Sequence, residues 1–278
     1  MSEMSERYDR LASRYATQWG PVHAPASLRV LDVVTARGAV TGAGTVFLDV
    51  GTGTGALAFE AVRRWPSVRV IGADSSAGML DEAERIGGAT LSPADASRVR
   101  WVHAEAGCLP LDDSAVDVAV SSFVLQLVPD RPAALREIRR VLRPGGLLAG
   151  VTWLADDTPF PPADAFDDAV VELAIDEPEE ADDDRAGDPV SPAAIAAQLR
   201  RAGFRMAGAA EDVAVHHWTR DGYLAFKLGF EELSLLSSLT SAQRSRLERL
   251  ARGRLAALPP GDFDWSARTV YFWGVRPD

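Results

Sequence analysis

The chain has 278 residues and a formal net charge of −11. Negative charge repels phosphate groups, so nucleic acids and anionic membrane surfaces are excluded as expected partners and a small molecule is favoured. One cysteine, Cys108, allows neither an intramolecular disulfide nor a cysteine-based metal cluster. The polar N-terminus and the lack of a long apolar segment favour the cytoplasm. The sequence indicates no oligomeric state.

Residues 6–40 carry two helical patterns that are interrupted near Gly20-Pro21. In the first pattern aromatic or leucine side chains recur every three to four residues, at Tyr8, Leu11, Tyr15 and Trp19. This spacing places them in one stripe along a helix, and such stripes usually pack into a core.

From residue 46 onward, short apolar runs alternate with helical patterns that end at proline or glycine. The predicted elements are strand 46–50, helix 56–65, strand 68–73, helix 76–86, strand 99–104, strand 116–122, helix 132–142 and strand 147–153. The alternation predicts an α/β fold with a doubly wound parallel sheet.

After Trp153 the composition becomes acidic and proline-rich. We expect a mobile, solvated segment over 156–188 around a short helix, since a solvated face is a commoner role for such a run than a surface for a cationic partner. The remaining predicted elements are helices 163–175, 191–202, 221–237 and 241–257, and strands within 204–218 and at 268–275. We expect 1–278 to be one domain with a core at 44–153 and cap insertions at 156–262.

The most informative feature is the turn after the first predicted strand, where Asp49 is followed by Gly51, Gly53 and Gly55. Glycines allow a sharp turn and let a ligand approach main-chain N–H groups, although a turn without a ligand is the alternative. Asp49 would repel a pyrophosphate but favour a cation. The turn therefore favours S-adenosylmethionine (SAM), which carries an ammonium and a sulfonium, over NAD.

A second acidic residue, Asp74, ends the next predicted strand. In doubly wound folds an acid at this distance from the glycine turn binds ribose hydroxyls. Asp and Ser are also common helix N-caps, so a capping role is the alternative and both can hold. Met79 would lie on the helix face toward the adenine, or in the core.

Four motifs occur in order between residues 44 and 153: the Asp-x-Gly-x-Gly-x-Gly turn, Asp-Ser-Ser at 74–76, acid-Ala-x-x-Leu-Pro at 105–110, and Leu-Arg-Glu-Ile-Arg-Arg-Val-Leu-Arg-Pro-Gly-Gly at 135–146. Together they resemble the class I SAM-dependent methyltransferases, in the small-molecule branch that includes ubiquinone/menaquinone C-methyltransferase-like proteins. The resemblance implies a Rossmann-like seven-stranded sheet, mostly parallel with the last strand antiparallel, and helical cap insertions.

The resemblance also implies roles for individual residues. The methionine part of SAM would contact the glycine turn, Glu105 and Ala106 would read the adenine edge, Ser121 would lie near the sulfonium, and Tyr15 would be a lid residue on the N-terminal helices at 1–40. The implied cofactor-binding residues are Tyr15, Asp49, Gly51, Thr52, Gly53, Asp74, Ser75, Met79, Glu105, Ala106 and Ser121. Two positions depart from the family: Glu105 replaces a commoner Asp, and Gln126 replaces a histidine found in many relatives.

No catalytic base is evident. Methyl transfer is an in-line displacement, and a protein base is needed only if the acceptor must lose a proton. His216 and His217 are candidates, but neighbouring strand residues face opposite ways, and a structural role is favoured. A metal site is disfavoured because no acid ends the fourth strand, and the Asn-Pro-Pro-Tyr motif of nucleic-acid and protein amide methylases is absent.

The acceptor site is expected outside the core, where aromatic residues would form an apolar cap over the methyl group. This favours a small apolar or aromatic metabolite, although each side chain could equally belong to a hydrophobic core. The candidate acceptor-binding residues are Trp19, Gln126, Trp153, Phe226 and Phe230.

Two other functions are alternatives to methyl transfer. Tyr223 and Lys227 have the spacing of a short-chain dehydrogenase pair, but the glycine spacing of that family is missing and Asp49 opposes NAD(P). A methyltransferase-fold protein that binds SAM without methyl transfer, such as a pericyclase-like cyclase or a ligand-binding protein, stays open because function lies in the acceptor site.

Overall fold

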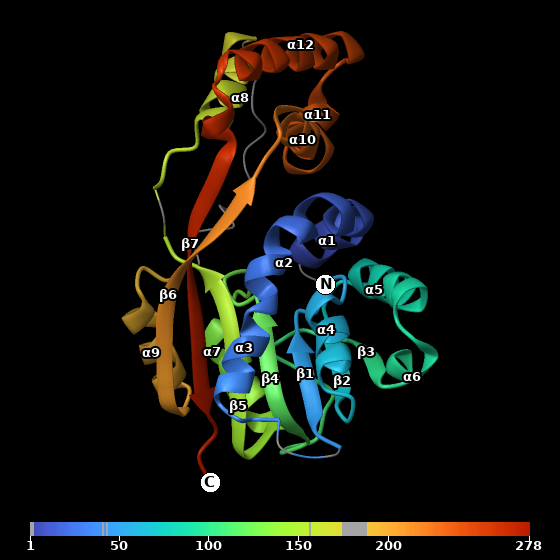
Figure 1. Cartoon of the computed structure of the whole chain (residues 1–278), viewed down its shortest axis with the longest axis vertical. Helices are drawn as coiled ribbons and strands as arrows, with labels where there is room; N and C mark the ends of the chain where they lie inside the picture. Colours follow the sequence, from blue (N-terminus) through green and yellow to red (C-terminus); the bar gives the residue numbers. More distant parts are fainter. Residues whose placement is uncertain (1–2, 41, 43, 156, 174–187) are drawn as a thin grey trace.

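The structure is a computed structural model that describes residues 3–40, 42, 44–155, 157–173 and 188–278. Seven strands form one sheet in the order β3-β2-β1-β4-β5-β7-β6 (Figure 1). Strands β1 to β5 are parallel, and β7 is antiparallel to both β5 and β6. The strands are β1 Val46–Val50, β2 Arg69–Asp74, β3 Val99–His103, β4 Val116–Ser122, β5 Leu142–Trp153, β6 Arg205–His217 and β7 Asp264–Val275. The predicted Rossmann-like sheet with an antiparallel last strand is confirmed.

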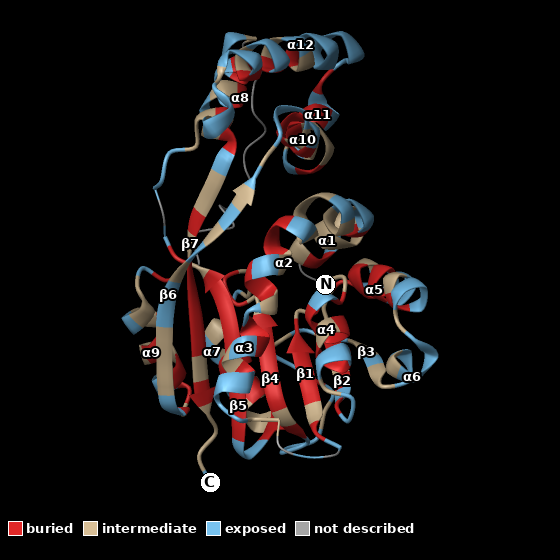
Figure 2. Ribbon diagram, viewed as in Figure 1, coloured by how far each residue is buried: buried red, intermediate tan, exposed pale blue. Residues whose placement is uncertain are grey.

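Helices cover both faces of the sheet, and each face has its own hydrophobic cluster. Leu135 of α7 and Ile195 of α9 belong to one cluster, whereas Leu31 of α3 and Ala58 of α4 belong to the other. The central strands β1 and β4 are mostly buried because their apolar side chains point into both clusters (Figure 2). These helices and their neighbours are α3 Val30–Ala36, α4 Ala56–Arg64, α5 Ala77–Thr90, α6 Pro93–Ala96, α7 Arg131–Val141 and α9 Pro192–Arg201.

The N-terminal region is one helical run with a wide turn in it. Helix α1, Glu3–Arg14, leads into a π turn, Tyr15–Trp19, and then into α2, Gly20–Leu28. The N–H of Gly20 donates to the carbonyl of Tyr15, five residues back, and Pro21 follows where a helix start needs no N–H. The break predicted near Gly20-Pro21 is therefore a widened turn.

A two-stranded ribbon extends past the sheet. The β5–β7 pairing ends at Trp153 opposite Thr269, whereas β6 and β7 stay paired as far as His217 opposite Asp264. The ribbon carries a helical cap, which we define as α8 Pro161–Glu172, α10 Arg220–Phe226, the π turn Lys227–Glu231, α11 Leu233–Ser238 and α12 Ser241–Ala257. The cap has a third hydrophobic cluster around Phe166 and Leu247 and lies above α1 and α2 in Figure 1.

Some predicted boundaries were wrong for physical reasons. Gly87 does not end α5: a Cβ there would lie 3.0 Å from the Phe59 ring, so this glycine allows close packing inside the helix. Strand β7 begins at Asp264 because the ribbon prolongs it, and helix 221–237 is divided by a π turn. Much of the acidic segment, residues 174–187, lies outside the described residues, and no helix in the described part is long and apolar enough to cross a membrane.

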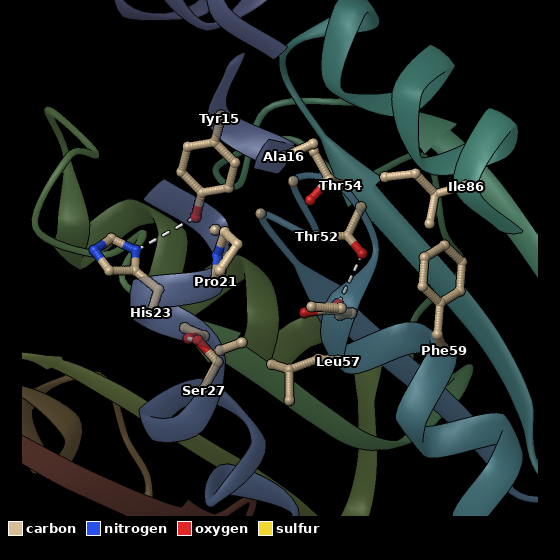
Figure 3. Close-up of a pocket in the computed structure, with 17 residues that line it drawn as sticks. Tyr15, Ala16, Pro21, His23, Ser27, Thr52, Thr54, Leu57, Phe59 and Ile86 are labelled. Carbon is tan, nitrogen blue, oxygen red and sulfur yellow. Dashed lines mark hydrogen bonds between the residues drawn. The ribbon is translucent and has the colours of Figure 1, made fainter. Parts of the chain in front are cut away.

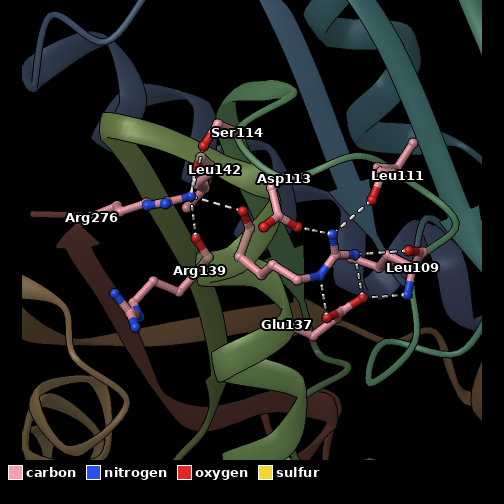
Figure 4. A network of polar contacts seen from close by, with 9 residues as sticks. Leu109, Leu111, Asp113, Ser114, Glu137, Arg139, Leu142 and Arg276 are labelled. Atoms are coloured by element: carbon pink, nitrogen blue, oxygen red, sulfur yellow. Dashed lines mark hydrogen bonds and ion pairs between the residues drawn. The ribbon is translucent and has the colours of Figure 1, made fainter. Parts of the chain in front are cut away.

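The 105–110 and 135–146 motifs are joined by an arginine network (Figure 4). The Arg140 guanidinium donates to the Glu137 carboxylate, to Asp113 at 2.6 Å and to the carbonyls of Leu109 and Leu111. Hydrogen bonds from Arg140 hold the pKa of Glu137 below its usual value. The network holds the loop after β3 in place. These two motifs therefore stabilise the edge of the sheet that carries the predicted cofactor residues.

Candidate cofactor and acceptor site

The glycine turn has a backbone that only glycine adopts easily. Gly51, Gly53 and Gly55 have φ values of +70°, +52° and +87°. A Cβ at Gly51 would lie 2.2 Å from Val124, whereas a Cβ at Gly53 would meet no described atom within 4 Å. Gly51 is thus required by packing, and Gly53 leaves a space that a side chain would fill.

The N–H groups of this turn are used within the protein. Gly51 and Thr52 donate to the carbonyl of Ala73, Gly53 donates to Asp74 at 2.8 Å, and Gly55 donates to the carbonyl of Thr52. These four N–H groups are donated within the protein in this structure, and contact of a ligand with the turn stays a prediction. Because they are not free to bind a phosphate, the turn fits a cationic ligand better than a pyrophosphate.

Asp49 is the acid that faces this turn. Its side chain is buried, with Oδ2 accepting from the Thr52 hydroxyl at 2.7 Å and Oδ1 accepting from none of the described groups. Burial raises the pKa of Asp49 to about 7, against a smaller lowering by the Thr52 hydrogen bond. A buried carboxylate oxygen without a partner is costly, and a bound ammonium or sulfonium would compensate it.

A cavity of about 260 Å³ lies between the glycine turn and the N-terminal helices (Figure 3). Of the predicted cofactor residues, the structure brings five to its wall: Tyr15, Asp49, Gly51, Thr52 and Gly53. Ser122 lines the cavity instead of Ser121, because successive strand side chains point to opposite faces. Ser121 is buried and its hydroxyl has no partner among the described residues.

Asp74 lies beside this cavity at the end of β2. Its carboxylate accepts from the N–H of Gly53 and of Ser76, and burial raises its pKa. The α5 N-cap is Ser76, so Asp74 does not cap the helix itself. Helix α1 covers this corner: Asp9 accepts from Ser76 at 2.6 Å, and Ser5 donates to Ser75.

The residues predicted to contact adenine lie outside the cavity wall. Met79 is buried on α5, whereas Glu105 is exposed and Ala106 is partly buried in the loop after β3. Since β3, β2 and β1 are parallel neighbours, these residues share one edge of the sheet with Asp74 and Asp49. The structure brings them to that edge, and their adenine contacts stay a prediction.

Four of the five predicted acceptor residues are linked by aromatic contacts between the N-terminal helices, the sheet and the cap. Trp19 stacks on Phe226 with ring centroids 5.0 Å apart, and Phe226 stacks on Phe230. Trp265 on the ribbon contacts both Trp19 and Trp153. Gln126 does not join them, because its side chain accepts from Thr152 at 2.7 Å within the core.

Sequence reasoning missed His23, which lies on α2 and lines the cavity. Its ring is packed among aromatic rings. The ring centroid of His23 lies 4.4 Å from that of Trp19, 4.7 Å from that of Phe123 and 5.3 Å from that of Trp153. Nδ1 is 3.4 Å from the Tyr15 hydroxyl. The signal was present, because His23 follows Trp19 by one helical turn and continues the aromatic stripe.

The other candidates lie on the ribbon or in the cap. His217 is exposed and contacts Asp264, and the His216 ring lies against Trp218. Lys227 donates to Glu231 and Glu232; although burial lowers its pKa, these carboxylates raise it more, so the lysine stays charged. The Tyr223–Lys227 pair thus forms part of the cap, away from the glycine turn.

Comparisons with known proteins agree with this geometry. Residues 47–146 match the family model described as a methyltransferase domain. The ubiquinone/menaquinone biosynthesis C-methyltransferase UbiE of Paracoccus denitrificans is 37% identical over 145 residues, which are 51% of this chain and 55% of that protein. A malonyl-[acyl-carrier protein] O-methyltransferase of Xylella fastidiosa is 37% identical over 109 residues, which are 37% of this chain and 33% of that protein. The chain therefore spans about half the length, or less, of these curated relatives.

Solved structures share the fold at low identity. The YcgJ protein of Bacillus subtilis matches with a TM-score of 0.58 at 17% identity, covering 90% of this chain and 99% of that one. The [4+2]-cyclase SpnF matches with a TM-score of 0.55 at 19% identity, covering 90% and 81%. The domain match and the motifs therefore make residues 47–146 similar to a methyltransferase domain, and the curated relatives that the chain resembles are small-molecule methyltransferases.

Proposed function

We propose that the protein transfers the methyl group of SAM to a small apolar or aromatic acceptor. The observation that carries the proposal is Asp49, whose buried carboxylate oxygen lacks a partner among the described residues and faces a cavity beside the glycine turn. SAM supplies an electrophilic methyl group on a positively charged sulfur. Asp49 and the turn would hold its cationic methionine part, and Asp74 would accept hydrogen bonds from the ribose.

The acceptor would approach from the aromatic side of the cavity. Trp19, Trp153 and Phe226 are linked there by ring contacts, and such rings hold flat apolar molecules and exclude water. The related enzymes named above carry C- and O-methyltransferase names, so the methylated atom does not follow from the relatives. We propose a cytoplasmic protein of one domain without a nucleic-acid partner, on the basis of the acidic charge and the single cysteine.

The first test is calorimetric titration with SAM, S-adenosylhomocysteine, NADH and NADPH in parallel. Binding of the two sulfur compounds alone would support the proposal, and binding of a nicotinamide would contradict it. Asp74→Ala should weaken SAM binding about tenfold, the scale of one hydrogen bond to a charged group. Unchanged affinity in a folded variant would remove the ribose role.

A SAM-binding protein without methyl transfer is the second candidate, because the fold is also that of a cyclase. Mass spectrometry of acceptor reactions separates the two. A product heavier by one methyl group indicates transfer, whereas a rearranged product of unchanged mass indicates a cyclase.

A further inference from the structure

His23 is a buried polar side chain in the cavity wall that the proposed function leaves without a role. The residue is 7% exposed, and its Nε2 has no hydrogen-bond partner among the described residues. The Tyr15 hydroxyl lies at the other ring nitrogen, Nδ1, and Figure 3 shows Nε2 pointing to the side away from Thr52 and the glycine turn. A buried nitrogen without a partner calls for a ligand atom.

The surroundings of His23 restrict that ligand. Its ring contacts Trp19, Phe123 and Trp153, and burial is the one cause of its pKa shift among the described residues. Burial lowers the pKa of His23 to about 3, so the imidazole is neutral at physiological pH. A neutral imidazole between rings suits a flat molecule with a neutral polar group better than a carboxylate or a phosphate, which would need a cation.

The backbone conformation of Phe123 independently supports a binding site next to His23. It has φ +54° directly after β4, a left-handed conformation that is uncommon for a bulky residue. In this conformation the ring centroid of Phe123 lies 4.2 Å from that of Trp153 and 4.7 Å from that of His23. Such backbone strain clusters at ligand sites, where surrounding structure maintains it.

We propose, building on the proposed function, that His23 binds the hydroxyl group of an aromatic acceptor through Nε2 and takes its proton during O-methylation. The O–CH₃ bond forms as the S–CH₃ bond breaks, the S–CH₃ electron pair stays on sulfur, and the hydroxyl proton passes to Nε2. Tyr15 orients the ring through Nδ1, and its hydroxyl can donate or accept there.

The overall charge balance of the reaction allows a base of such low pKa to accept the proton. The donor brings one positive charge on sulfur, and that charge disappears from sulfur when the methyl group leaves. If Nε2 takes the proton, one positive charge stays within the site, so no net charge is created in the apolar surroundings. Because a base of low pKa cannot ionise a phenol beforehand, the proton moves with the methyl transfer and not before it.

The test compares His23→Asn, which keeps a polar atom near the Nδ1 position, with His23→Gln, which keeps one near the Nε2 position. His216→Asn on the ribbon is the matched control. With S-adenosylhomocysteine bound, calorimetry measures the affinity of each variant for 2-naphthol and for naphthalene, which lacks the hydroxyl. We expect His23→Asn to lose about tenfold in 2-naphthol affinity, His23→Gln to lose less, and naphthalene binding to be unchanged.

Turnover gives a second readout that a structural role would not produce. His23→Asn and His23→Gln should both slow methylation of 2-naphthol at least tenfold, but should spare a nitrophenol that is already ionised at the assay pH. Equal losses for both acceptors would overturn the proton role. Wild-type protein that binds S-adenosylhomocysteine but does not prefer 2-naphthol to naphthalene would overturn the hydroxyl site alone, whereas failure to bind S-adenosylhomocysteine would overturn the proposed function.

Discussion

The glycine turn and the cap would bind their proposed ligands by different means. At the turn, the site is defined by backbone geometry and by two carboxylates, the buried Asp49 and the partly buried Asp74, and most of the polar groups there are fixed by hydrogen bonds. In the cap and its contact with the N-terminal helices, stacked rings such as Trp19 and Phe226 define the site without directional polar bonds. The first arrangement suits one invariant cofactor, and the second suits acceptors that differ in shape.

Asp49→Asn should produce the largest effect on the cofactor half. Loss of the charge should weaken SAM binding about 100-fold, the upper range for a hydrogen bond to a charged group. The fold should become more stable: the pKa of Asp49 rises from 3.8 to about 7 on folding, so its ionisation lowers stability progressively between about pH 4 and pH 7 and to the full extent above pH 7. We expect a gain on the order of 4 kcal/mol in the free energy of unfolding at pH 8, since each pKa unit corresponds to about 1.4 kcal/mol.

Urea unfolding and calorimetry at pH 8 measure both effects. Asp32→Asn, which removes an exposed acid paired with Arg64, is the control and should change neither by much. Weaker binding together with lower stability would show that Asp49 is a structural residue.

The pH dependence of SAM affinity should be nearly as large. Protonation of Asp49 competes with a cationic ligand, so affinity should fall as pH drops below about 7, approaching tenfold per pH unit. Titrations between pH 5.5 and 8.5 would show the slope, and Asp49→Asn should abolish it. A flat wild-type profile would mean that the cation does not meet this carboxylate.

Gly53→Ala and Gly38→Ala form a matched pair for the backbone part of the comparison. Both glycines have positive φ, +52° and +62°, and a Cβ at either would meet no described atom within 4 Å. Each change should cost about 1 kcal/mol of stability through backbone strain. Only Gly53→Ala should weaken SAM binding, about tenfold, and equal affinities would show that the open space at Gly53 is not occupied by the cofactor.

Phe226→Leu should have the smallest effect on the cofactor. It removes the ring that stacks on Trp19 and Phe230, so it should lower stability by about 1 kcal/mol and raise the acceptor KM several-fold. SAM affinity should change less than twofold in calorimetry. A large loss of SAM affinity would mean that the two halves are coupled through the N-terminal helices.

The sequence predicted the fold around the glycine turn well because local constraints determine it. Alternating strands and helices, the three glycines and the acids at strand ends follow from backbone geometry, and each can be recognised within a few residues. Ser122 lines the cavity and Ser121 does not, because strand phase decides which of two adjacent side chains faces the cavity, and the predicted Ser121 contact stays a prediction.

The acceptor half was less predictable because contacts distant in sequence create it. Gln126 meets Thr152 in the core, His23 meets Phe123 and Trp153, and no local pattern specifies these partners. The ribbon also depends on strand pairing between residues about 50 apart, so its length did not follow from the helix and strand patterns.

The ribbon of β6 and β7 attaches the cap to the sheet. Residues 264–268 of β7 pair with β6 alone, so changes in the cap need not disturb the pairing of β5 with β7. Related proteins could therefore carry different caps on the same sheet. A chimaera that takes both α8 and the residues between β6 and β7 from a second parent should keep the cofactor of the first parent and adopt the acceptor choice of the second.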